Sequence, residues 1–525
     1  MRTLCYSLWL VLFIGMLGLR PVHAQQQQPS QQQQPSQQQQ PSPQQPQDTA
    51  TQPVPAGRIG LGGVVGTGDV GGNAGPQGLT PDTHSLVGAQ RLSLGTGHSF
   101  WQPFFDVSST VISNPATTST PTTWGTWTSL LADVDLHRIS GTSNLTLTYL
   151  GVGSLSNAGS TPSNAGGSGD TVTQQLGLAE RVTWRRSTIS LLDQVGYYPL
   201  AGFAYGGFGV STVPAAGASG SLGSIGFQSN FAADQSILAS LGQSISNASA
   251  VEVDTYLTPR KSLTFVGGDT LLHYFSNNVL DTNEVIFQGG YNDVLTRKDT
   301  IALFYRFDGF SYNHVSALSQ SIDDHSVEFS YARRVTGRMS FQVAAGPSVA
   351  FSLIPIPTST SSSSGSGSVG TTTSKSRQFF WGLTTTLNYQ LRRTSLALEY
   401  DHGVTGGSGV LFGSISDEAS FSASRQFTRR LNAVLTTGYS RNTGLAVTPT
   451  SSDTLSPSGI NQTFNYWFGG ANLVRQFGRW INLSLGYQVQ FQNSNSAFCA
   501  ATCGTSFLQH MAILELGWHP RAIAF

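Results

Sequence analysis

Alternation of apolar and polar residues, continued through hairpins, most strongly constrains how this chain can fold. The stretch SFSASRQFTRRLNAVLTTGYSR covers residues 420–441. Phe421, Leu435 and Tyr439 fall on one face of it, and Ser, Thr and Asn residues fall on the other. A period of two residues is typical of a strand, because successive side chains point to opposite sides. The alternation breaks at 428–430 and then resumes, so the stretch predicts two antiparallel strands joined by a tight turn.

The same alternation recurs from about residue 98 to the end of the chain. Clear examples are 285–291, 301–307, 325–331, 381–391, 396–400, 481–491 and 508–518. The count gives sixteen strands between about 127 and 492 and a last strand at 506–518, and a further strand at 99–112 brings the total to eighteen.

Short turns and long loops alternate between these strands. Short turns are expected at 140–142, 185–186, 259–261, 296–299, 335–338, 392–394, 428–430 and 477–479. Long loops rich in Ser, Gly, Asn and Thr are expected at 155–170, 199–248, 276–283, 313–323, 354–376, 406–415, 442–461 and 493–505. This order predicts a meander with tight turns at one end and long loops at the other.

Charged residues are scarce for a chain of this length. They make up 10% of the sequence, whereas about 25% is usual in soluble domains. The polarity comes from small neutral residues, and 59 residues are Gly. The formal net charge of +0 offers no basic excess for nucleic acid. No later run of about eighteen apolar residues predicts a transmembrane helix. Part of the surface is therefore expected to face something other than water.

A barrel whose outer face contacts hydrocarbon explains the alternation better than a soluble β-sandwich does. A sandwich hides its apolar faces in a second sheet and seldom continues one meander through so many hairpins. In lipid every backbone N–H and C=O needs an internal partner, so spanning strands must close on themselves. The sequence predicts an all-β protein, a closed antiparallel up-and-down transmembrane β-barrel of sixteen to eighteen strands with eighteen as the best count.

Aromatic residues are expected to form two girdles at the lipid–water boundaries. Those near the short turns are Trp184, Phe427, Trp480 and Trp518, and those toward the long loops are Phe275, Tyr312, Tyr439 and Phe491. Arg and Lys residues at the tight turns form a basic ring at one mouth. Turn chemistry and solvation account for this ring, and contact with anionic lipid headgroups is the alternative.

Three segments precede the predicted barrel at 98–525. Residues 1–24 contain an early Arg, an apolar run and a small-residue site ending at Ala24, which predicts a secretory signal peptide. Residues 25–56 form a Gln/Pro-rich linker that is expected to be disordered, because it has nothing apolar to bury. Residues 57–97 form a Gly-rich segment.

The end of the chain carries a family resemblance. The strand LQHMAILELGW, at 508–518, and the terminal Phe525 resemble the last strand of Gram-negative outer-membrane β-barrels of the porin type. In that family the last strand ends in an aromatic residue, which implies recognition by the barrel-assembly machinery through Trp518 or Phe525. Residues 519–524 intervene here and depart from the pattern.

The resemblance also implies a place in the cell and a set of partners. It implies the bacterial outer membrane, with the short turns and the N-terminal linker in the periplasm and the long loops outside. Outer-membrane lipid is then a partner, and the resemblance also implies a homo-oligomer.

A barrel of this size leaves an aqueous channel, so passive diffusion of small hydrophilic solutes is the expected function. The alternative is an outer-membrane anchored adhesin or structural barrel with long surface loops and no open pore. A substrate-gated importer is less favoured, because residues 25–97 are too short and too poor in apolar residues to form a plug domain. The Gln/Pro-rich linker could instead reach the cell wall.

Strand parity predicts which charges line the pore. A charge that faced lipid would be costly, by about 2–4 kcal/mol for a basic group at the midplane, so the wet face is the expected side. The pore-lining candidates are Asp133, Asp135, Glu252, Asp254, Arg306, Asp308, Glu328 and Glu399. The set is mainly acidic, which suggests a preference for cations. Pairing of these charges across the wall, to hold its shape, is the structural alternative.

The longest loop, 199–248, is the candidate constriction. If 99–112 is the first strand, this loop is the third outward loop, and the porin resemblance implies that this loop folds into the lumen. Helical spacing follows a potential N-cap, which gives the candidates Asp234, Gln235, Ile237 and Leu238. A surface loop of Gly, Ala and Ser is the alternative.

The sequence predicts no enzyme, cofactor or metal site. The G-x-G-x-x-G matches at 66–71 and 365–370 do not follow a strand and open a helix. His273, His314, His325 and His402 could approach the outer rim, where a barrel-type hydrolase would place its site. Cys499 and Cys503 are expected to form a disulfide across a short loop in an oxidising compartment.

Overall fold

The computed structural model of the protein describes most of the region after residue 98. The described residues are 99–113, 124–156, 171–198, 244–275, 281–313, 320–358, 370–406, 411, 413–445, 463–478, 480–495, 506–518, 520–521 and 523–525. The chain divides into two units, Met1–Thr51 and Gln52–Phe525, and all described residues belong to the second.

The described residues form one meandering antiparallel sheet. Its strands are β1 (Phe100–Ser113), β2 (Trp124–Ser140), β3 (Ser143–Ser156), β4 (Thr171–Thr183), β5 (Ser187–Tyr198), β6 (Ser244–Thr258), β7 (Lys261–Tyr274), β8 (Asp281–Val294), β9 (Asp299–Asn313), β10 (Gln320–Thr336), β11 (Met339–Thr358), β12 (Gly370–Gln390), β13 (Thr394–Thr405), β14 (Ser414–Thr428), β15 (Leu431–Gly444), β16 (Thr463–Phe477), β17 (Ile481–Ser494), β18 (Ser506–Trp518) and β19 (Ile523–Ala524). The prediction of a strand near 99–112 is confirmed by β1.

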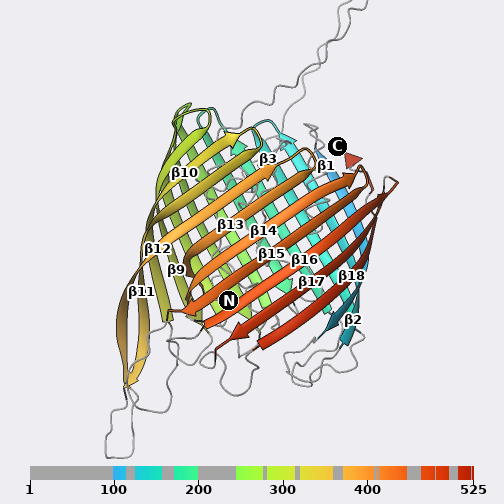
Figure 1. The fold of residues 1–525 in the computed structure, drawn as a ribbon. Helices are drawn as coiled ribbons and strands as arrows, with labels where there is room; N and C mark the ends of the chain where they lie inside the picture. The colour runs from blue at the N-terminus through green and yellow to red at the C-terminus, as the bar shows by residue number, and fades with distance from the viewer. Residues whose placement is uncertain are drawn as a thin grey trace, which may run out of the picture. The chain divides into compact units, whose positions relative to one another are not determined.

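The sheet closes because β1 pairs with β2 on one edge and with β18 on the other (Figure 1). The closing register places Phe105 opposite Trp518, and their rings stack with centroids 5.8 Å apart. The two-residue strand β19 adds to the seam by pairing with the start of β1, and the Phe525 N–H donates to the Ser99 carbonyl. The ring of β1 to β18 confirms the predicted closed antiparallel barrel with eighteen long strands.

The two faces of the wall differ as the alternation predicts. On β1, Phe105 and Val107 are 46% and 49% exposed on the outside, whereas Phe104 and Asp106 are 1% and 2% exposed on the inside. The same outward row on other strands holds Leu130, Leu176, Phe287, Leu303, Phe329, Leu398, Leu435, Leu485 and Leu514. Among the described residues there is no helix with the length and hydropathy of a membrane span.

Short turns join the strands at one end of the barrel. All the predicted short turns occur, from Gly141 with φ of 56° to Gly478 with φ of 70°. Thr residues stabilise several of them: the Oγ1 of Thr258 accepts the N–H groups of Arg260 and Lys261 at 3.3 and 3.1 Å. Thr296, Thr336 and Thr428 make the same kind of bond in their own turns.

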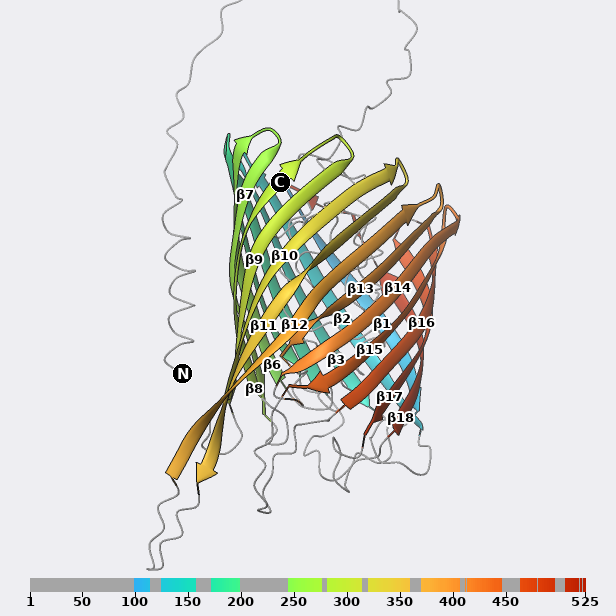
Figure 2. The same ribbon diagram turned by 60° about the vertical axis from the view of Figure 1, so that its left-hand side comes forward.

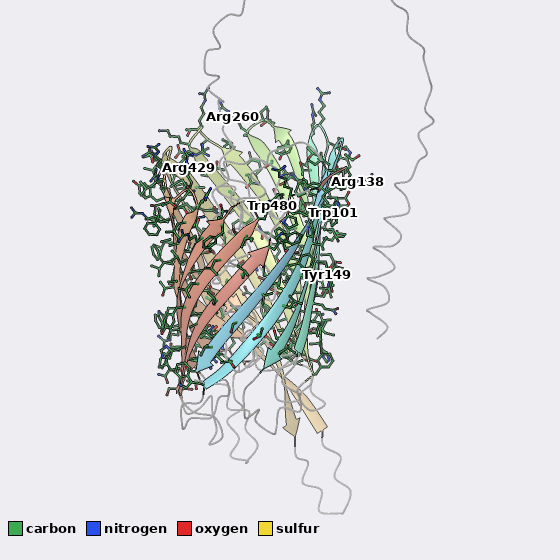
Figure 3. The ribbon with its side chains drawn as sticks, turned by 90° about the vertical axis from the view of Figure 1, so that its right-hand side faces the viewer. Trp101, Arg138, Tyr149, Arg260, Arg429 and Trp480 are labelled. Carbon is green, nitrogen blue, oxygen red and sulfur yellow. The ribbon has the colours of Figure 1, made fainter. Side chains whose placement is uncertain are left out.

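Basic and aromatic side chains lie together at this turn end. Figure 3 shows Arg138, Arg260 and Arg429 at the rim and Trp101 and Trp480 close to it, with Tyr149 farther along the wall. Three arginines lie over outward rings, with Arg425 5.3 Å from Phe427, Arg475 4.9 Å from Phe477 and Arg521 5.4 Å from Trp480. This arrangement of amphipathic rings beneath charges is typical of a lipid–water boundary.

The girdle predicted at the loop end needs one correction. Phe275 and Tyr439 are exposed on the outside, but Tyr312 faces the inside and is 2% exposed. The cause is parity, because Tyr312 shares the inward row of β9 with Arg306 and Asp308. Closeness to a long loop does not decide on which face a ring lies.

The strands are longer at the loop end than the sequence pattern predicts. The range predicted as the loop 199–248 overlaps β6, which begins at Ser244. β11 and β12 form the longest hairpin, and Figure 2 shows it running past the ends of the neighbouring strands. β12 pairs with β13 only from Leu383 to Gln390, and beyond Leu383 its one partner in the described sheet is β11.

The outward face gives a depth-dependent prediction. Leu435 lies five residues beyond the turn at Arg430, about 12 Å along the barrel axis for a tilted strand, whereas Leu431 directly follows the turn. We expect Leu435→Arg to lower the free energy of unfolding in lipid vesicles by about 2–4 kcal/mol and Leu431→Arg to lower it by about 0–1 kcal/mol. Urea titration followed by tryptophan fluorescence measures both, and equal costs would contradict a lipid-facing wall.

Candidate functional site

The inward face of the described strands carries many carboxyl groups and few arginines. The inward carboxyl groups are Asp106, Asp133, Glu252, Asp254, Glu284, Asp308, Asp324, Glu328, Glu399, Asp401, Glu418 and Glu515, and the inward arginines are Arg181, Arg306 and Arg334. Arg181 and Arg334 lie close to the short turns, so Arg306 is the arginine of this set deep within the wall.

The predicted pore-lining residues divide into separate places on this face. Asp133 lies on β2, and Glu252 and Asp254 lie on β6, where Asp254 accepts a hydrogen bond from the Thr264 hydroxyl. The backbone of Asp135 pairs with Gln102, and its side chain lies outside the described ones.

The other four predicted residues come together. Arg306 and Asp308 are on β9, Glu328 is on β10 and Glu399 is on β13. With three more inward carboxyl groups they form what we call the Arg306 cluster, which consists of Glu284, Arg306, Asp308, Asp324, Glu328, Glu399 and Asp401.

Arg306 holds the centre of this cluster. Its Nε donates to Asp308 Oδ2 at 2.7 Å, and both side chains are almost fully buried. Glu284 and Glu328 lie within electrostatic range of the same guanidinium. One buried positive charge therefore offsets part of the negative charge of several strands.

Hydroxyl groups hold two of the flanking carboxylates. Asp324 accepts a hydrogen bond from the Ser348 hydroxyl across the β10–β11 pair. Asp401 Oδ2 accepts one from the Thr384 hydroxyl at 2.9 Å across the β12–β13 pair. These neutral donors fix the positions of the carboxylates without neutralising their charge.

Two glycines leave room for the side chain of Glu328 to extend across the inner face of the neighbouring strands. A Cβ at Gly382 would lie 3.3 Å from Glu328 Oε1, so this carboxylate reaches across β11 to β12. Gly346 pairs with Gly382 on the intervening strand, and a Cβ there would overlap the Val327 carbonyl oxygen. The close approach of β10 and β11 at this point thus requires glycine.

Sequence reasoning missed Glu284, Asp324 and Asp401. Asp324 and Asp401 have the parity of the predicted Glu328 and Glu399 on the same strands, so alternation alone could have found them. Glu284 directly follows the range predicted as the loop 276–283, whereas β8 already begins at Asp281.

Apolar side chains cover the inside of the barrel next to the Arg306 cluster, toward the loop end. What we call the inner apolar cluster consists of Phe310, Tyr312, Ile322, Ala350, Val404 and Leu445. Phe380 and Ile415 pack against it.

The connection between β13 and β14 joins this inner apolar cluster. Gly413 has φ of 71°, and a Cβ there would lie 3.3 Å from the Tyr312 hydroxyl and in overlap with Ile322 Cδ1. The Leu445 N–H donates to the Gly413 carbonyl at 3.1 Å. This connection is the inward-reaching loop element that the described residues show. The predicted constriction residues Asp234, Gln235, Ile237 and Leu238 lie outside the described residues.

The remaining predicted residues fall elsewhere. Cys499 and Cys503 lie outside the described residues, so their disulfide stays a prediction. Trp518 ends β18 and Phe525 adjoins β1 at the same seam.

The described histidines do not gather into one site. His273 Nδ1 lies 2.7 Å from Asp281 Oδ2, and His402 Nδ1 lies 2.6 Å from Asp417 Oδ1 on a different part of the wall. His325 contacts the Tyr305 hydroxyl at 2.7 Å, and His314 lies outside the described residues. Within the described ranges no group of three His, Cys, Asp or Glu side chains is placed to hold a metal ion.

A polar patch on the outer wall consists of Asp193 on β5, Asn247 and Ser249 on β6 and Asp269 on β7. Register places Asp193 opposite Ser249 and Ser249 opposite Asp269. The Asn247 amide donates to Asp193 Oδ1 at 3.0 Å. Exposed Val195 and Val251 flank the patch along its strands. Carboxyl groups in such apolar surroundings are poorly matched to acyl chains.

Comparison with known proteins concerns the fold. No protein-family model and no curated protein matches the sequence. OccAB1 of Acinetobacter baumannii is 11% identical, with 81% of this chain and 97% of that chain covered and a TM-score of 0.38. For the outer membrane protein OpdK of Pseudomonas aeruginosa the values are 9%, 80%, 99% and 0.36. For the ferric-catecholate import receptor Fiu of E. coli K12 they are 8%, 79%, 81% and 0.39. At such identities the likeness extends to the fold alone.

The Arg306 cluster yields a stability prediction. Arg306→Met leaves Asp308 and its neighbours buried without their guanidinium, so we expect the free energy of unfolding to fall by about 3–5 kcal/mol. Arg306→Met/Asp308→Asn removes one of the uncompensated charges, and it should be more stable than the single variant. Urea unfolding of refolded protein in detergent measures both, and a double variant less stable than Arg306→Met would contradict the electrostatic account.

Proposed function

We propose that this chain is an outer-membrane channel for passive diffusion of small hydrophilic solutes, with a preference for cations. The observation that carries the proposal is the closed ring of strands with apolar side chains outside and an acidic, polar face inside. Such a barrel separates acyl chains from an internal polar path, and charges on that path set its selectivity.

The cation preference follows from the balance of inward charge. Inward carboxyl groups outnumber inward arginines on the described strands, and they recur on β1, β2, β6, β8 to β10, β13, β14 and β18. Two unit charges attract or repel by about 1 kcal/mol at 4 Å in water and by several times more near a low-dielectric wall. An anion would meet repulsion from half of the long strands that line the path, whereas a cation would be attracted to them.

The proposed partners follow from the outer surface. Outer-membrane lipid would cover the apolar rows, and the barrel-assembly machinery would read the seam that ends in Trp518 and Phe525. We propose that a second copy of the chain covers the polar patch of Asp193, Asn247, Ser249 and Asp269, because a protein surface can satisfy hydrogen-bonding groups that lipid cannot.

A second candidate function is an anchored adhesin or structural barrel without an open pore. The burial of the inner face favours it, since Glu284, Asn442 and Gln509 are at most 1% exposed. The inner apolar cluster also covers part of the inner wall toward the loop end. The predicted signal peptide at 1–24, the periplasmic linker at 25–56, the Gly-rich segment at 57–97 and the barrel boundary at 98 are part of either proposal.

Selectivity gives the first test, with adjacent aspartates as a matched pair. Asp324 faces the inside, whereas Asp323 faces outward opposite Gly309 and Phe351. In planar bilayers under a tenfold KCl gradient, we expect a reversal potential of the sign for K⁺ preference. Asp324→Asn should lower the K⁺/Cl⁻ permeability ratio at least twofold, and Asp323→Asn should leave it within experimental error. A Cl⁻-preferring wild type would overturn the cation preference.

Liposome swelling separates the channel from the structural barrel. A channel admits small sugars at rates that fall with sugar size, whereas a plugged barrel admits none. We expect deletion of 215–240 to raise the rate for the larger sugars if the loop at 199–243 constricts the lumen. An unchanged rate would remove that loop from the constriction and leave the β13–β14 connection as the narrowing element.

A further inference from the structure

Arginines gather on the outer surface at the turn end, in a sector that runs from the β12–β13 turn to the segment between β18 and β19. What we call the arginine sector consists of Arg393, Arg425, Arg429, Arg430, Arg475 and Arg521, and all six side chains are exposed. Parity places Arg425 of β14 and Arg475 of β16 on the outer face. Figure 3 shows Arg429 of this sector at the rim. The sector therefore presents several positive charges to the surroundings.

The strands that carry the arginine sector bring no counter-charge to it. The described Asp and Glu residues from 338 to the end of the chain are Glu399, Asp401, Asp417, Glu418 and Glu515. Four of these face the inside of the barrel. Asp417 faces outward, but it lies close to the loop end of β14, where it pairs with His402. Among the described residues of β12 to β18, no carboxyl side chain thus faces outward near the turns.

Another sector of the same rim is built differently. Lys261 on β7 lies opposite Asp293 on β8, with its Nζ 3.7 Å from Asp293 Oδ2. Arg333 on β10 lies opposite Asp299 on β9, with its Nε 3.6 Å from Asp299 Oδ1. These outward cations meet carboxylates of their own chain. Turn chemistry and solvation apply equally to both sectors, so they do not explain why the arginine sector lacks such partners.

Aromatic rings hold three of the guanidinium groups at the outer surface. Phe427, Phe477 and Trp480 lie beneath the guanidinium groups of Arg425, Arg475 and Arg521, at centroid distances of 5.3, 4.9 and 5.4 Å. A ring face attracts the cation but accepts few of its N–H groups, so most of these donors stay free to bind an anion. Rings of this kind mark the lipid–water boundary, and the anions of that boundary are the phosphates of lipid headgroups.

Neighbouring strands bring the arginines close to one another. Arg425 on β14 and Arg475 on β16 both pair with the first three residues of β15. Their backbones therefore lie on either side of one strand, roughly 10 Å apart. The β14–β15 turn is tied to the next strand as well, because the Gln476 N–H donates to the Arg430 carbonyl at 2.8 Å. Long arginine side chains on this fixed frame can reach the same headgroup.

We propose that the arginine sector binds the headgroups of anionic phospholipids in preference to zwitterionic ones. Arg425 and Arg475 would donate to the phosphate oxygens, as the planar guanidinium group does well, and the acyl chains would lie along the outward apolar rows of β14 to β17. A zwitterionic headgroup carries a cation beside its phosphate, which the arginines would repel. The inference rests on the proposed function, since it requires lipid against the outer wall, and it names the class of that lipid and its place.

Lipid binding to the full chain in detergent tests the proposal without measuring transport. The probes are dioleoyl phosphatidylglycerol, which is anionic, and dioleoyl phosphatidylcholine, which is zwitterionic and has the same acyl chains. Native mass spectrometry measures the affinity for each lipid. We expect phosphatidylglycerol to bind at least threefold more tightly. Equal affinities, or tighter binding of phosphatidylcholine, would overturn the proposal.

Two double variants with the same change of charge assign the preference to the sector. Arg425→Gln/Arg475→Gln should lower the ratio of the two affinities at least twofold. The control Lys261→Gln/Arg333→Gln removes two positive charges from the paired sector of the same rim, and it should leave the ratio within experimental error. An equal loss in both would show a general effect of charge and overturn the assignment. If either double variant fails to fold, its two single variants make the same comparison.

The failure of this inference differs from the failure of the channel. A preference for phosphatidylglycerol in a barrel that conducts no ions would support the lipid site and overturn the pore. Ion conductance by a barrel that binds both lipids equally would support the pore and overturn the lipid site.

Discussion

The whole structure depends on the pairing of backbone groups where water is absent. A strand in hydrocarbon leaves no N–H or C=O without an internal partner, so a spanning sheet must close. The barrel closes through the antiparallel pairing of β1 with β18. At the turn end β19 also pairs with β1 and lengthens this seam. Every other feature follows from that ring. The alternation of side chains separates an apolar outside from a polar inside, and the inside is the place where this chain can put its carboxyl groups.

Most of this architecture could be predicted from local pattern. Period-2 alternation and turn residues are local signals, and they identified the strands, the short turns and the closed barrel with eighteen long strands. The turns could be predicted because their residues act locally. Thr residues at 258, 296, 336 and 428 each accept a backbone N–H from a residue two positions ahead in the same turn. Loop-end boundaries were less readable. The prolines at the end of β11 and the Gly, Thr and Ser residues at the start of β12 have the composition of a loop, and it is the pairing of the two strands that extends the hairpin.

The candidate site could be predicted only in part, because it depends on contacts between strands. Parity placed Arg306, Asp308, Glu328 and Glu399 on one face but could not show that β9, β10 and β13 bring them together. That neighbourhood depends on register and on the glycines at 346 and 382, which let Glu328 lie across two strands. The assignment of Tyr312 to the outer girdle was wrong for a related reason. Its inward position follows from the row that it shares with Phe310, whereas the prediction used its distance from a loop.

Because the chain has few charged residues, the carboxyl groups of its inner face have a large effect on the electric field inside the barrel. Long stretches of the inside are lined by Ser, Thr, Asn and Gln, which can bind water or solute without favouring either sign of charge. The field of the inward carboxyl groups is therefore not cancelled by a dense background of opposite charges on the described strands. Screening in salt reaches about 8–10 Å at physiological ionic strength, so a solute feels the Arg306 cluster mainly when it is close to it. Selectivity in such a barrel would therefore depend, at each point along the wall, on the carboxyl groups that lie nearest to the solute.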